Sequence, residues 1–364
     1  MKRVLEADAL IVGAGPAGCA AAINLAPLRQ VLLVERRAEV TPRVGESLVP
    51  AARRLLTDMG LWESFIAEGH EPWYGNRAVW GAPEPLEVDF MRDPDGHGWH
   101  LDRARFEQWL RAHATKRGAG FIAPASVDHL AHDGERWQVQ LNTPASQCTA
   151  NVKLIIEAGG RAAPVARKQG ARVQASDRLI CAWVSGRDAR ESNRGLTYVE
   201  AVEDGWWYTA PVPGRQRILA FYTDADLPNA RVINKRDGLL ERAASAEELS
   251  ALLTAAGFVP EAQSHVTAAH SAMLDPCAEE SWLAVGDAAI SFDPLSSQGL
   301  LNALFTGLAA ANAADRYLEG DAHSLSVYRQ VVRGIGDAYR QHLASFYATE
   351  QRWPEAQFWR RRRA

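Results

Sequence analysis

Three glycines near the start of the chain have the spacing of a pyrophosphate-binding loop. Gly13, Gly15 and Gly18 lie in the segment DALIVGAGPAG (8–18), between a short apolar run and a run of alanines. The first glycine permits a tight turn, the second lets the backbone approach a diphosphate, and the third lets a helix sit close to a strand. Glu35 follows about 20 residues later, where an acid accepts hydrogen bonds from ribose hydroxyls. The pattern predicts a dinucleotide site.

A strand, a turn, a helix and a second strand are needed to position these residues. The apolar run before Gly13, the helical run after it and the apolar segment VLLV (31–34) provide that order. The helix N-terminus would direct free N–H groups and its positive dipole end at the diphosphate.

Two later segments indicate which dinucleotide is bound. EAGGR (157–161) and VGDAA…DPLSSQG (285–299) both follow apolar strands. A nicotinamide dehydrogenase does not need the last segment. FAD needs an acid for its ribityl chain, and a second helix N-terminus near its ring stabilises charge on the reduced flavin. The three separated segments therefore predict an FAD site.

The composition indicates one large globular enzyme without a charge-driven partner. Of the 364 residues, 47% are hydrophobic and 23% are charged, and the net charge of -4 gives no general attraction to nucleic acid or anionic membrane. Four separated cysteines without metal spacing predict buried, reduced thiols and no metal site. No segment has the ~20 apolar residues of a membrane span, so we expect a cytoplasmic protein. The four arginines at 360–363 are interpreted as a solvated tail.

Hydrophobic periodicity predicts alternating FAD-binding and β-rich regions. Helices are expected over 51–59, 101–119 and 238–256, and strands over 86–90, 136–141, 152–160, 265–273 and 281–289, with a β-rich region at 178–224. We expect an FAD-binding domain from 1–75, 100–172 and 275–320, a β-rich substrate domain from 76–99 and 173–274, and a helical C-terminal segment from 321–364.

The motifs together resemble the FAD-dependent monooxygenases of the p-hydroxybenzoate hydroxylase fold. They are GAGPAG, the acid after the next strand, RVGES, LDRARFEQWL, EAGGR and GDAA…FDPLSSQGL, and the likeness covers nearly the whole chain. Within that superfamily, VGESLVP, GWHLDRARF, GWW and RWPEAQFW resemble the tryptophan-halogenase-like branch. They are most similar to the maturases that hydroxylate tryptophan in precursors of tryptophylquinone-containing amine dehydrogenases and amino-acid oxidases. The resemblance implies an α/β fold, in which a Rossmann-like FAD-binding domain is interleaved with a β-sheet substrate domain and followed by a helical C-terminal tail.

By position, the resemblance also implies FAD contacts along the chain. The glycine loop would bind the pyrophosphate, Glu35 the adenosine ribose, Arg105 the phosphate or ribityl oxygens, and Asp287 the pyrophosphate–ribityl segment. The loop at 294–299 would border the isoalloxazine ring. The full implied set is Gly13, Gly15, Pro16, Ala17, Gly18, Glu35, Arg36, Arg43, Ser47, Arg105, Gly159, Asp287, Pro294, Ser297, Gln298, Gly299 and Leu300. Glu157 stands where the family usually has Asp, which keeps the charge.

Two departures from the halogenases matter more. Those enzymes need a lysine near the substrate, between the flavin motif and the LDR helix, and residues 48–98 contain none. Their WxWxIP motif is present only as WWYTAP (206–211). Both departures favour hydroxylation, because a flavin C4a-hydroperoxide transfers oxygen without a protein nucleophile.

Each candidate for the chemical step also has a structural interpretation. Glu46 is the acid candidate in the flavin segment, although it could only hold a loop. His100 could transfer a proton or be a satisfied core histidine, and Asp293 could orient substrate or cap the next helix. Trp206 and Tyr208 could form an aromatic wall for the substrate, and strand alternation would place Trp207 on the opposite face.

The sequence therefore predicts an FAD-dependent monooxygenase that hydroxylates an aromatic ring, with an indole or a tryptophan in a protein or peptide as the expected substrate. NAD(P)H or another reduced flavin or electron donor would be the reductant, and O2 the co-substrate. Three alternatives remain open: a flavin-dependent halogenase of a small aromatic, a reductase of the geranylgeranyl-reductase type, and a non-catalytic FAD-binding partner protein.

Overall fold

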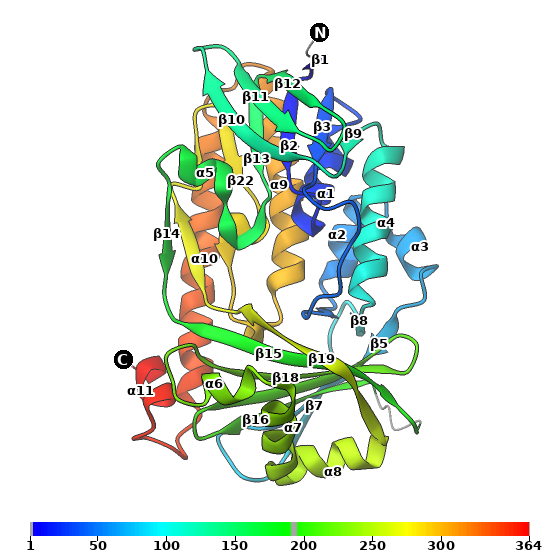
Figure 1. The fold of residues 1–364 in the computed structure, drawn as a ribbon, viewed down its shortest axis with the longest axis vertical. Helices are drawn as coiled ribbons and strands as arrows, with labels where there is room; N and C mark the ends of the chain where they lie inside the picture. Colours follow the sequence, from blue (N-terminus) through cyan, green and yellow to red (C-terminus); the bar gives the residue numbers. More distant parts are fainter. Residues whose placement is uncertain (1–2, 191–194, 364) are drawn as a thin grey trace.

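The fold combines an upper α/β region with a large lower sheet, and both are joined along one side by a long helix (Figure 1). The computed structural model describes residues 3–190 and 195–363. The predicted α/β class and helical C-terminal segment are confirmed. The latter forms α10 (Ser324–Ala348) and α11 (Gln357–Arg363).

A six-stranded sheet carries the glycine-rich loop. Its order is β21 (Ala278–Glu279), β22 (Trp282–Ala284), β13 (Leu154–Glu157), β2 (Ala9–Val12), β3 (Val31–Val34) and β9 (Gly120–Ile122). The strands from β22 to β9 are parallel, and β13 and β22 are fully buried, as expected for a sheet covered on both faces. The helices α1 (Pro16–Leu25) and α9 (Gly299–Leu318) pack closely, because a Cβ at Gly307 would lie only 2.4 Å from the Ala17 carbonyl oxygen.

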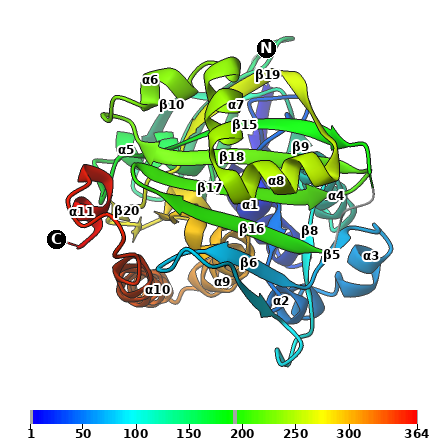
Figure 2. The same cartoon turned by 90° about the horizontal axis from the view of Figure 1, so that it is seen from below.

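A seven-stranded sheet forms the lower region. Its order is β19 (Phe258–Ala268), β15 (Leu179–Asp188), β18 (Gln216–Asp224), β17 (Gly205–Val212), β16 (Leu196–Val202), β6 (Gly75–Val79) and β7 (Leu86–Asp89). Figure 2 shows α8 (Glu247–Ala256) lying across its outer face. Its inner face is turned toward the upper α/β region and packs in part against α10 and α11 (Figure 1).

Smaller sheets and helices connect these two regions. One sheet has the order β1 (Arg3–Glu6), β12 (Gln147–Val152), β11 (Trp137–Asn142), β10 (Ser126–His132). Two others are β14 (Arg172–Ala175), β20 (Ala272–Asp275), β23 (Ile290–Ser291), and β4 (Ser47–Leu48), β8 (Gly98–His100), β5 (Glu71–Trp73). The remaining α-helices are α2 (Ala52–Asp58), α3 (Trp62–Ile66), α4 (Arg103–Lys116), α5 (Pro164–Lys168), α6 (Ala230–Ile233), α7 (Arg236–Ser245) and α8 (Glu247–Ala256). The domain boundaries inferred from the sequence stay a prediction.

Two predicted elements are interrupted. The single helix expected over 238–256 divides at Ala246, whose backbone is extended. The Glu200 carboxylate accepts the Leu249 N–H (3.2 Å), which satisfies a donor of the new helix start. The strand expected over 265–273 divides because β19 pairs with β15, whereas β20 pairs with β14 and β23 in another sheet.

The interpretation of the terminal arginines as a solvated tail was wrong for two of them. Arg362 is buried and pairs with Asp224 (2.8 Å), and Arg361 pairs with Asp224 (3.0 Å) and Asp226 (2.7 Å). These ion pairs fasten α11 to the end of β18.

The four cysteines are buried and unbridged, as predicted. Among the described residues, none of the helices combines the length and the apolarity that a membrane crossing requires, and no group of side chains has the composition of a metal site.

Candidate active site

The glycine loop leaves open space at one of its three glycines. A Cβ at Gly13 (φ 112°) would lie 2.3 Å from the Ala158 carbonyl oxygen, and a Cβ at Gly18 would lie 1.9 Å from that of Gly13. A Cβ at Gly15, in contrast, would meet nothing within 4 Å. Gly13 and Gly18 are therefore required for packing, whereas Gly15 faces the space that a bound group would occupy, at the start of α1 beside Pro16 and Ala17.

Glu35 lies at the same loop. Its Oε2 accepts the Ala14 N–H (2.9 Å) and lies 3.7 Å from the Arg111 guanidinium. Arg111 also donates from Nε to the Ala14 carbonyl oxygen (3.1 Å). Arg36 follows as an exposed residue. Glu35, Arg111 and the glycine loop thus form one polar cluster.

The FAD contact inferred for Arg105 stays a prediction. Its Nε donates to Glu68 (2.7 Å) and its side chain is half exposed. The α4 side chains that contact the glycine loop and the 43–47 segment are Arg103, Glu107 and Arg111, at four-residue spacing, which places them on one helix face. That spacing is a signal that the sequence already contained.

Arg103 and Glu107 connect α4 to the segment that opens with Arg43. Arg103 donates to the Gly45 carbonyl oxygen and to Glu107 Oε1 (2.7 Å). The Arg43 guanidinium lies 3.8 Å from the same Glu107 oxygen, and the Arg43 side chain remains 40% exposed. Arg43 therefore has a free surface toward which a phosphate or ribityl oxygen could bind.

A second helix start lies at α9. Asp287 is exposed and 3.4 Å from Arg161, which also donates to Ser291 Oγ (2.9 Å). Pro294, Ser297 (φ 52°), Gln298 and Gly299 are half-buried, Leu300 is buried, and a Cβ at Gly299 would meet nothing within 4 Å. Gly159 has a packing role, since its N–H donates to Glu157 Oε1 (2.7 Å).

This donor set fits FAD. Helix N-termini suit the diphosphate, Glu35 and Asp287 suit ribose and ribityl hydroxyls, and the space beside Gly15 and Gly299 leaves room for the cofactor. The individual FAD contacts stay proposals.

Glu46 and Tyr208 meet at the centre of the inner face. The Tyr208 hydroxyl donates to Glu46 Oε1 and lies 2.9 Å from Ser47 Oγ, while Glu46 Oε2 accepts the Gly45 N–H (2.8 Å). Burial raises the pKa of Glu46, and the Tyr208 hydrogen bond opposes that rise. Burial and the nearby Glu46 carboxylate hold the pKa of Tyr208 well above 10. The pair is a buried acid–base unit beside the predicted flavin segment.

His100 extends this polar chain. Its Nε2 lies 2.9 Å from Thr197 Oγ1, and a hydrogen bond with Thr197 also acts on the Tyr208 hydroxyl. The buried Nδ1 has no partner among the described residues. Burial, with a smaller contribution from Arg217, lowers the His100 pKa to about 3, so the imidazole is neutral at pH 7. One ring nitrogen of His100 therefore lacks a hydrogen bond, so the alternative interpretation of His100 as a fully hydrogen-bonded core histidine does not hold.

Asp293 has the geometry of a positioning residue. Its Oδ1 accepts the Leu295 N–H (2.9 Å) and its Oδ2 accepts the Tyr347 hydroxyl (2.7 Å), so both oxygens hold the loop. Burial raises its pKa to about 6. Tyr347 in turn accepts the Trp206 Nε1–H (3.2 Å). We therefore assign the loop, rather than the substrate, as the direct contact of Asp293.

Strand alternation divides the three aromatic residues of β17 as predicted. Trp206 and Tyr208 lie on the inner face, in a cluster that includes Val44 and Leu295 from the two flavin loops. Trp207 lies on the outer face and packs against the cluster of α7 and α8. Trp206 stacks on Tyr222 with ring centroids 3.9 Å apart and is only 1% exposed, so it forms part of the packed core of the inner face, and its predicted contact with substrate stays a prediction.

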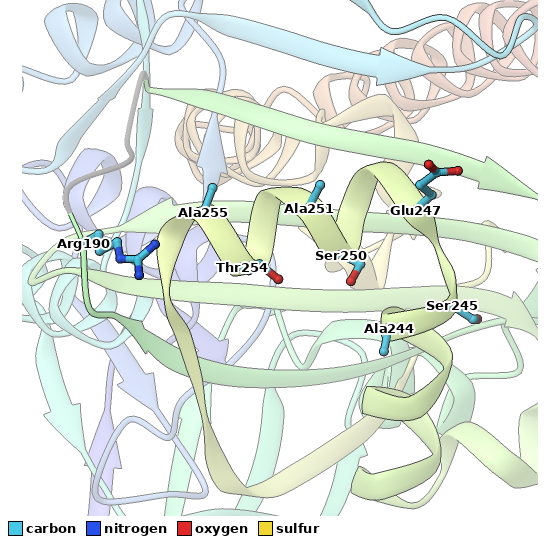
Figure 3. Close-up of a pocket in the computed structure, with 8 residues that line it drawn as sticks. All are labelled: Arg190, Ala244, Ser245, Glu247, Ser250, Ala251, Thr254 and Ala255. Carbon is cyan, nitrogen blue, oxygen red and sulfur yellow. The ribbon is translucent and has the colours of Figure 1, made fainter.

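Figure 3 shows a surface hollow at another place in the molecule. Arg190 and residues of α7 and α8 line it, including Ser250 and Thr254. These helices cover the outer face of the large sheet, on the opposite side from Glu46 and Tyr208. The hollow is therefore separate from the site of Glu46 and Tyr208.

The comparisons agree with this geometry. A family model described as "FAD binding domain" matches residues 6–324. The chain is 28% identical over 98% of its length to the putative FAD-dependent oxidoreductase LodB of Marinomonas mediterranea, covering 97% of that protein. Among solved structures, the flavin-dependent halogenase CmlS superposes with a TM-score of 0.86 (26% identity, covering all of this chain and 68% of CmlS). The peptidyl tryptophan dihydroxylase QhpG superposes with a TM-score of 0.76 (23% identity, covering 99% and 79%). Halogenases recur among the other curated relatives.

Proposed function

Because the chain belongs to the FAD-binding-domain family, we propose that this FAD-dependent oxidoreductase is a monooxygenase that hydroxylates an aromatic ring, with an indole or a peptidyl tryptophan as substrate. The observation that carries the proposal is the buried Glu46–Tyr208 pair on the sheet face that meets the flavin loops. The net reaction converts ArH, O2, two electrons and two protons into ArOH and water. NAD(P)H or another reduced flavin is the proposed electron source.

Bound FAD, when reduced, supplies the electrons that activate O2. The chain supplies binding, orientation and proton transfer. The α1 loop and Glu35 hold the adenosine diphosphate half, and Arg43, Asp287 and the 294–299 loop hold the flavin half. The stacked and almost fully buried Trp206 and Tyr222 form a rigid apolar layer of the inner face beside Tyr208, which would limit the access of water to the site.

Proton transfer is assigned to the polar chain at Tyr208. The ring carbon that gains oxygen must lose its proton. Tyr208 presents a hydroxyl that donates to the Glu46 carboxylate, and the raised pKa of Glu46 brings this base closer to neutral pH. Thr197 lies between Tyr208 and His100 and hydrogen-bonds to both, so these two residues orient the Tyr208 hydroxyl.

The placement of the lysines supports hydroxylation over halogenation. Lys153 lies 3.5 Å from Asp8, and Lys168 donates to the Asp128 carbonyl oxygen, both in the FAD-binding region. Lys116 ends α4, and Lys235 precedes α7 on the outer face. None of the lysines that the structure describes stands among the residues of the Glu46–Tyr208 chain.

Halogenation of a small aromatic is the second candidate, because halogenases recur among the relatives of this chain. LodB, whose name gives a putative FAD-dependent oxidoreductase and no halogenase activity, matches along nearly all of both chains. QhpG, named as a peptidyl tryptophan dihydroxylase, provides a precedent for tryptophan hydroxylation on this fold.

Labelled oxygen separates the two candidates. The FAD-loaded protein, a reductant and ¹⁸O₂ are incubated with tryptophan, indole and a tryptophan-containing peptide, in chloride or bromide buffer. Mass spectrometry is expected to show a gain of one ¹⁸O atom in an aromatic product, independent of halide. A halogenated ring without ¹⁸O would replace this proposal by the halogenase. No product in any arm would contradict both.

A further inference from the structure

A row of side chains crosses the inner face from Tyr208 to the open edge of the large sheet. Register places Tyr208 opposite Val199, Val199 opposite Ala78, and Ala78 opposite Leu86 on the edge strand β7. Tyr208, Val199 and Ala78 are half-buried and Leu86 is 66% exposed. The three strand spacings amount to about 14 Å. The row is therefore an apolar path that becomes more exposed away from the acid–base pair.

The opposite half of the sheet is closed. Tyr208 lies opposite Ala220 and Ala220 opposite Trp183, while His265 on the edge strand β19 faces Trp183. Trp183 is only 5% exposed, and its ring packs on His265 with centroids 4.6 Å apart. Because β17 is the central strand, three strand spacings separate Tyr208 from either edge of the sheet. The row toward β7 contains the half-buried Val199 and Ala78, whereas the row toward β19 contains the buried Ala220 and Trp183.

The β7 edge has the features of a strand-docking surface. It ends the sheet order, so its outer backbone groups have no neighbouring strand among the described residues. Residues 82–89 are all exposed, and Val88 is 54% and Met91 is 88% exposed. Segment 84–93 carries four carboxylates (Glu84, Glu87, Asp89 and Asp93) and the guanidinium of Arg92, and Arg77 of β6 lies 3.9 Å from Glu87, so four negative and two positive charges leave a net charge of -2 at this edge. An apolar, acidic free edge is complementary to an extended segment with basic flanks.

Building on the proposed function, we propose that β7 docks an extended, basic polypeptide segment as an added strand, and that the residues that follow this segment cross the row Leu86–Ala78–Val199 and carry a tryptophan to Tyr208. Four strand spacings, about 19 Å, separate the added strand from Tyr208, which about six extended residues can span. Main-chain hydrogen bonds to β7 would supply affinity, and Leu86 and Val88 would contact alternate side chains of the guest strand. The acidic residues of segment 84–93 would favour guest segments with basic residues on either side.

A labelled peptide tests the docking separately from the chemistry. The probe is a fluorescein-labelled peptide in which lysines flank a segment of alternating valine and threonine and a tryptophan follows about six residues later. Its affinity for the FAD-loaded full chain is measured by fluorescence anisotropy. A matched probe carries glutamate in place of lysine.

The variant Leu86→Asp/Val88→Asp is compared with Val259→Asp/Val266→Asp on the opposite edge, where the wild-type valines are also exposed (61% and 42%). FAD content and melting temperature verify that both variants fold. We expect at least about tenfold weaker peptide binding for the β7 variant and for the glutamate probe, and unchanged binding for the β19 variant.

Three results overturn the docking proposal: equal binding by both variants, no peptide binding by the wild type, or a wild-type dimer in sedimentation that the β7 substitutions dissociate. The last would identify a second copy of the chain as the occupant. Peptide binding at β7 without ¹⁸O incorporation would instead contradict the proposed function and leave the docking site intact.

Discussion

The substitution Tyr208→Phe is the most direct test of the acid–base pair. It removes the hydroxyl that donates to Glu46 Oε1 and lies 2.9 Å from Ser47 Oγ. A hydrogen bond to a charged group contributes about 1.5–3 kcal/mol, so the free energy of unfolding should fall by about that amount. Positioned acid–base groups contribute about 10²–10⁴ in rate. Since Glu46 remains in the variant, we expect a loss near the lower limit, ~100-fold or about 2.7 kcal/mol.

The pH dependence gives a second readout. The Tyr208 hydrogen bond lowers the pKa of Glu46 against the effect of burial, so its removal raises that pKa further. A base acts when it is ionised. The acidic limb of the rate profile should therefore move to higher pH in the variant, measured as single-turnover ¹⁸O incorporation at saturating substrate.

Tyr198 provides a matched control. Its hydroxyl donates to Glu200 Oε2 (2.8 Å), which is also a buried tyrosine–glutamate contact, but on the outer face of the sheet. Tyr198→Phe should cost similar stability while the rate and its pH profile stay unchanged. Equal rate losses in the two variants, or an unmoved acidic limb in Tyr208→Phe, would refute the role of the pair.

Three further predictions concern the cofactor loop, the flavin loop and the C-terminal helix. Gly15→Val should fold with a normal melting temperature but bind FAD at least about tenfold more weakly in a fluorescence titration. Gly18→Ala should instead lower the melting temperature, because its Cβ would lie 1.9 Å from a carbonyl oxygen. Equal effects of the two variants on melting temperature and FAD binding would contradict the assignment. Burial raises the Asp293 pKa from 3.8 to about 6, so the folded state retains this proton while pH rises from 4 to 6 and the unfolded state loses it. The free energy of unfolding should therefore fall by up to about 3 kcal/mol between pH 4 and 6. Urea unfolding should show no such fall in Asp293→Asn, and a fall that persists in the variant would count against the assignment. The double variant Arg361→Ala/Arg362→Ala removes both ion-pair partners of the buried Asp224 and should cost about 3–5 kcal/mol in thermal unfolding, while exposed Arg360→Ala should cost almost nothing. Similar losses in the two variants would contradict the buried ion pairs.

Local sequence patterns predicted the glycine loop and Glu35 more directly than the pairing of Glu46 with Tyr208. The glycine spacing and Glu35 could be found because strand, turn and helix are encoded within about 30 residues. The FAD contact of Arg105 follows from a motif and stays a prediction, whereas the four-residue periodicity of Arg103, Glu107 and Arg111 identifies the helix face that meets the glycine loop and the 43–47 segment.

The remaining features depend on distant partners. Glu46 and Tyr208 are 162 positions apart, and Arg361 meets Asp226 across 135 positions. No short pattern specifies such pairs, because sheet register and helix packing create them. Alternation along β17 nevertheless predicted which aromatic residues share a face, since a strand turns successive side chains to opposite sides.

The packing of α1 against α9 has a consequence for biosynthesis. Nearly every residue of α1 is buried, yet its partner helix begins at Gly299. At ordinary translation rates, this apolar segment must wait roughly half a minute on the ribosome before its partner emerges. Nascent chains should therefore depend on chaperones during this interval, and the cofactor can be captured only after synthesis has passed α9.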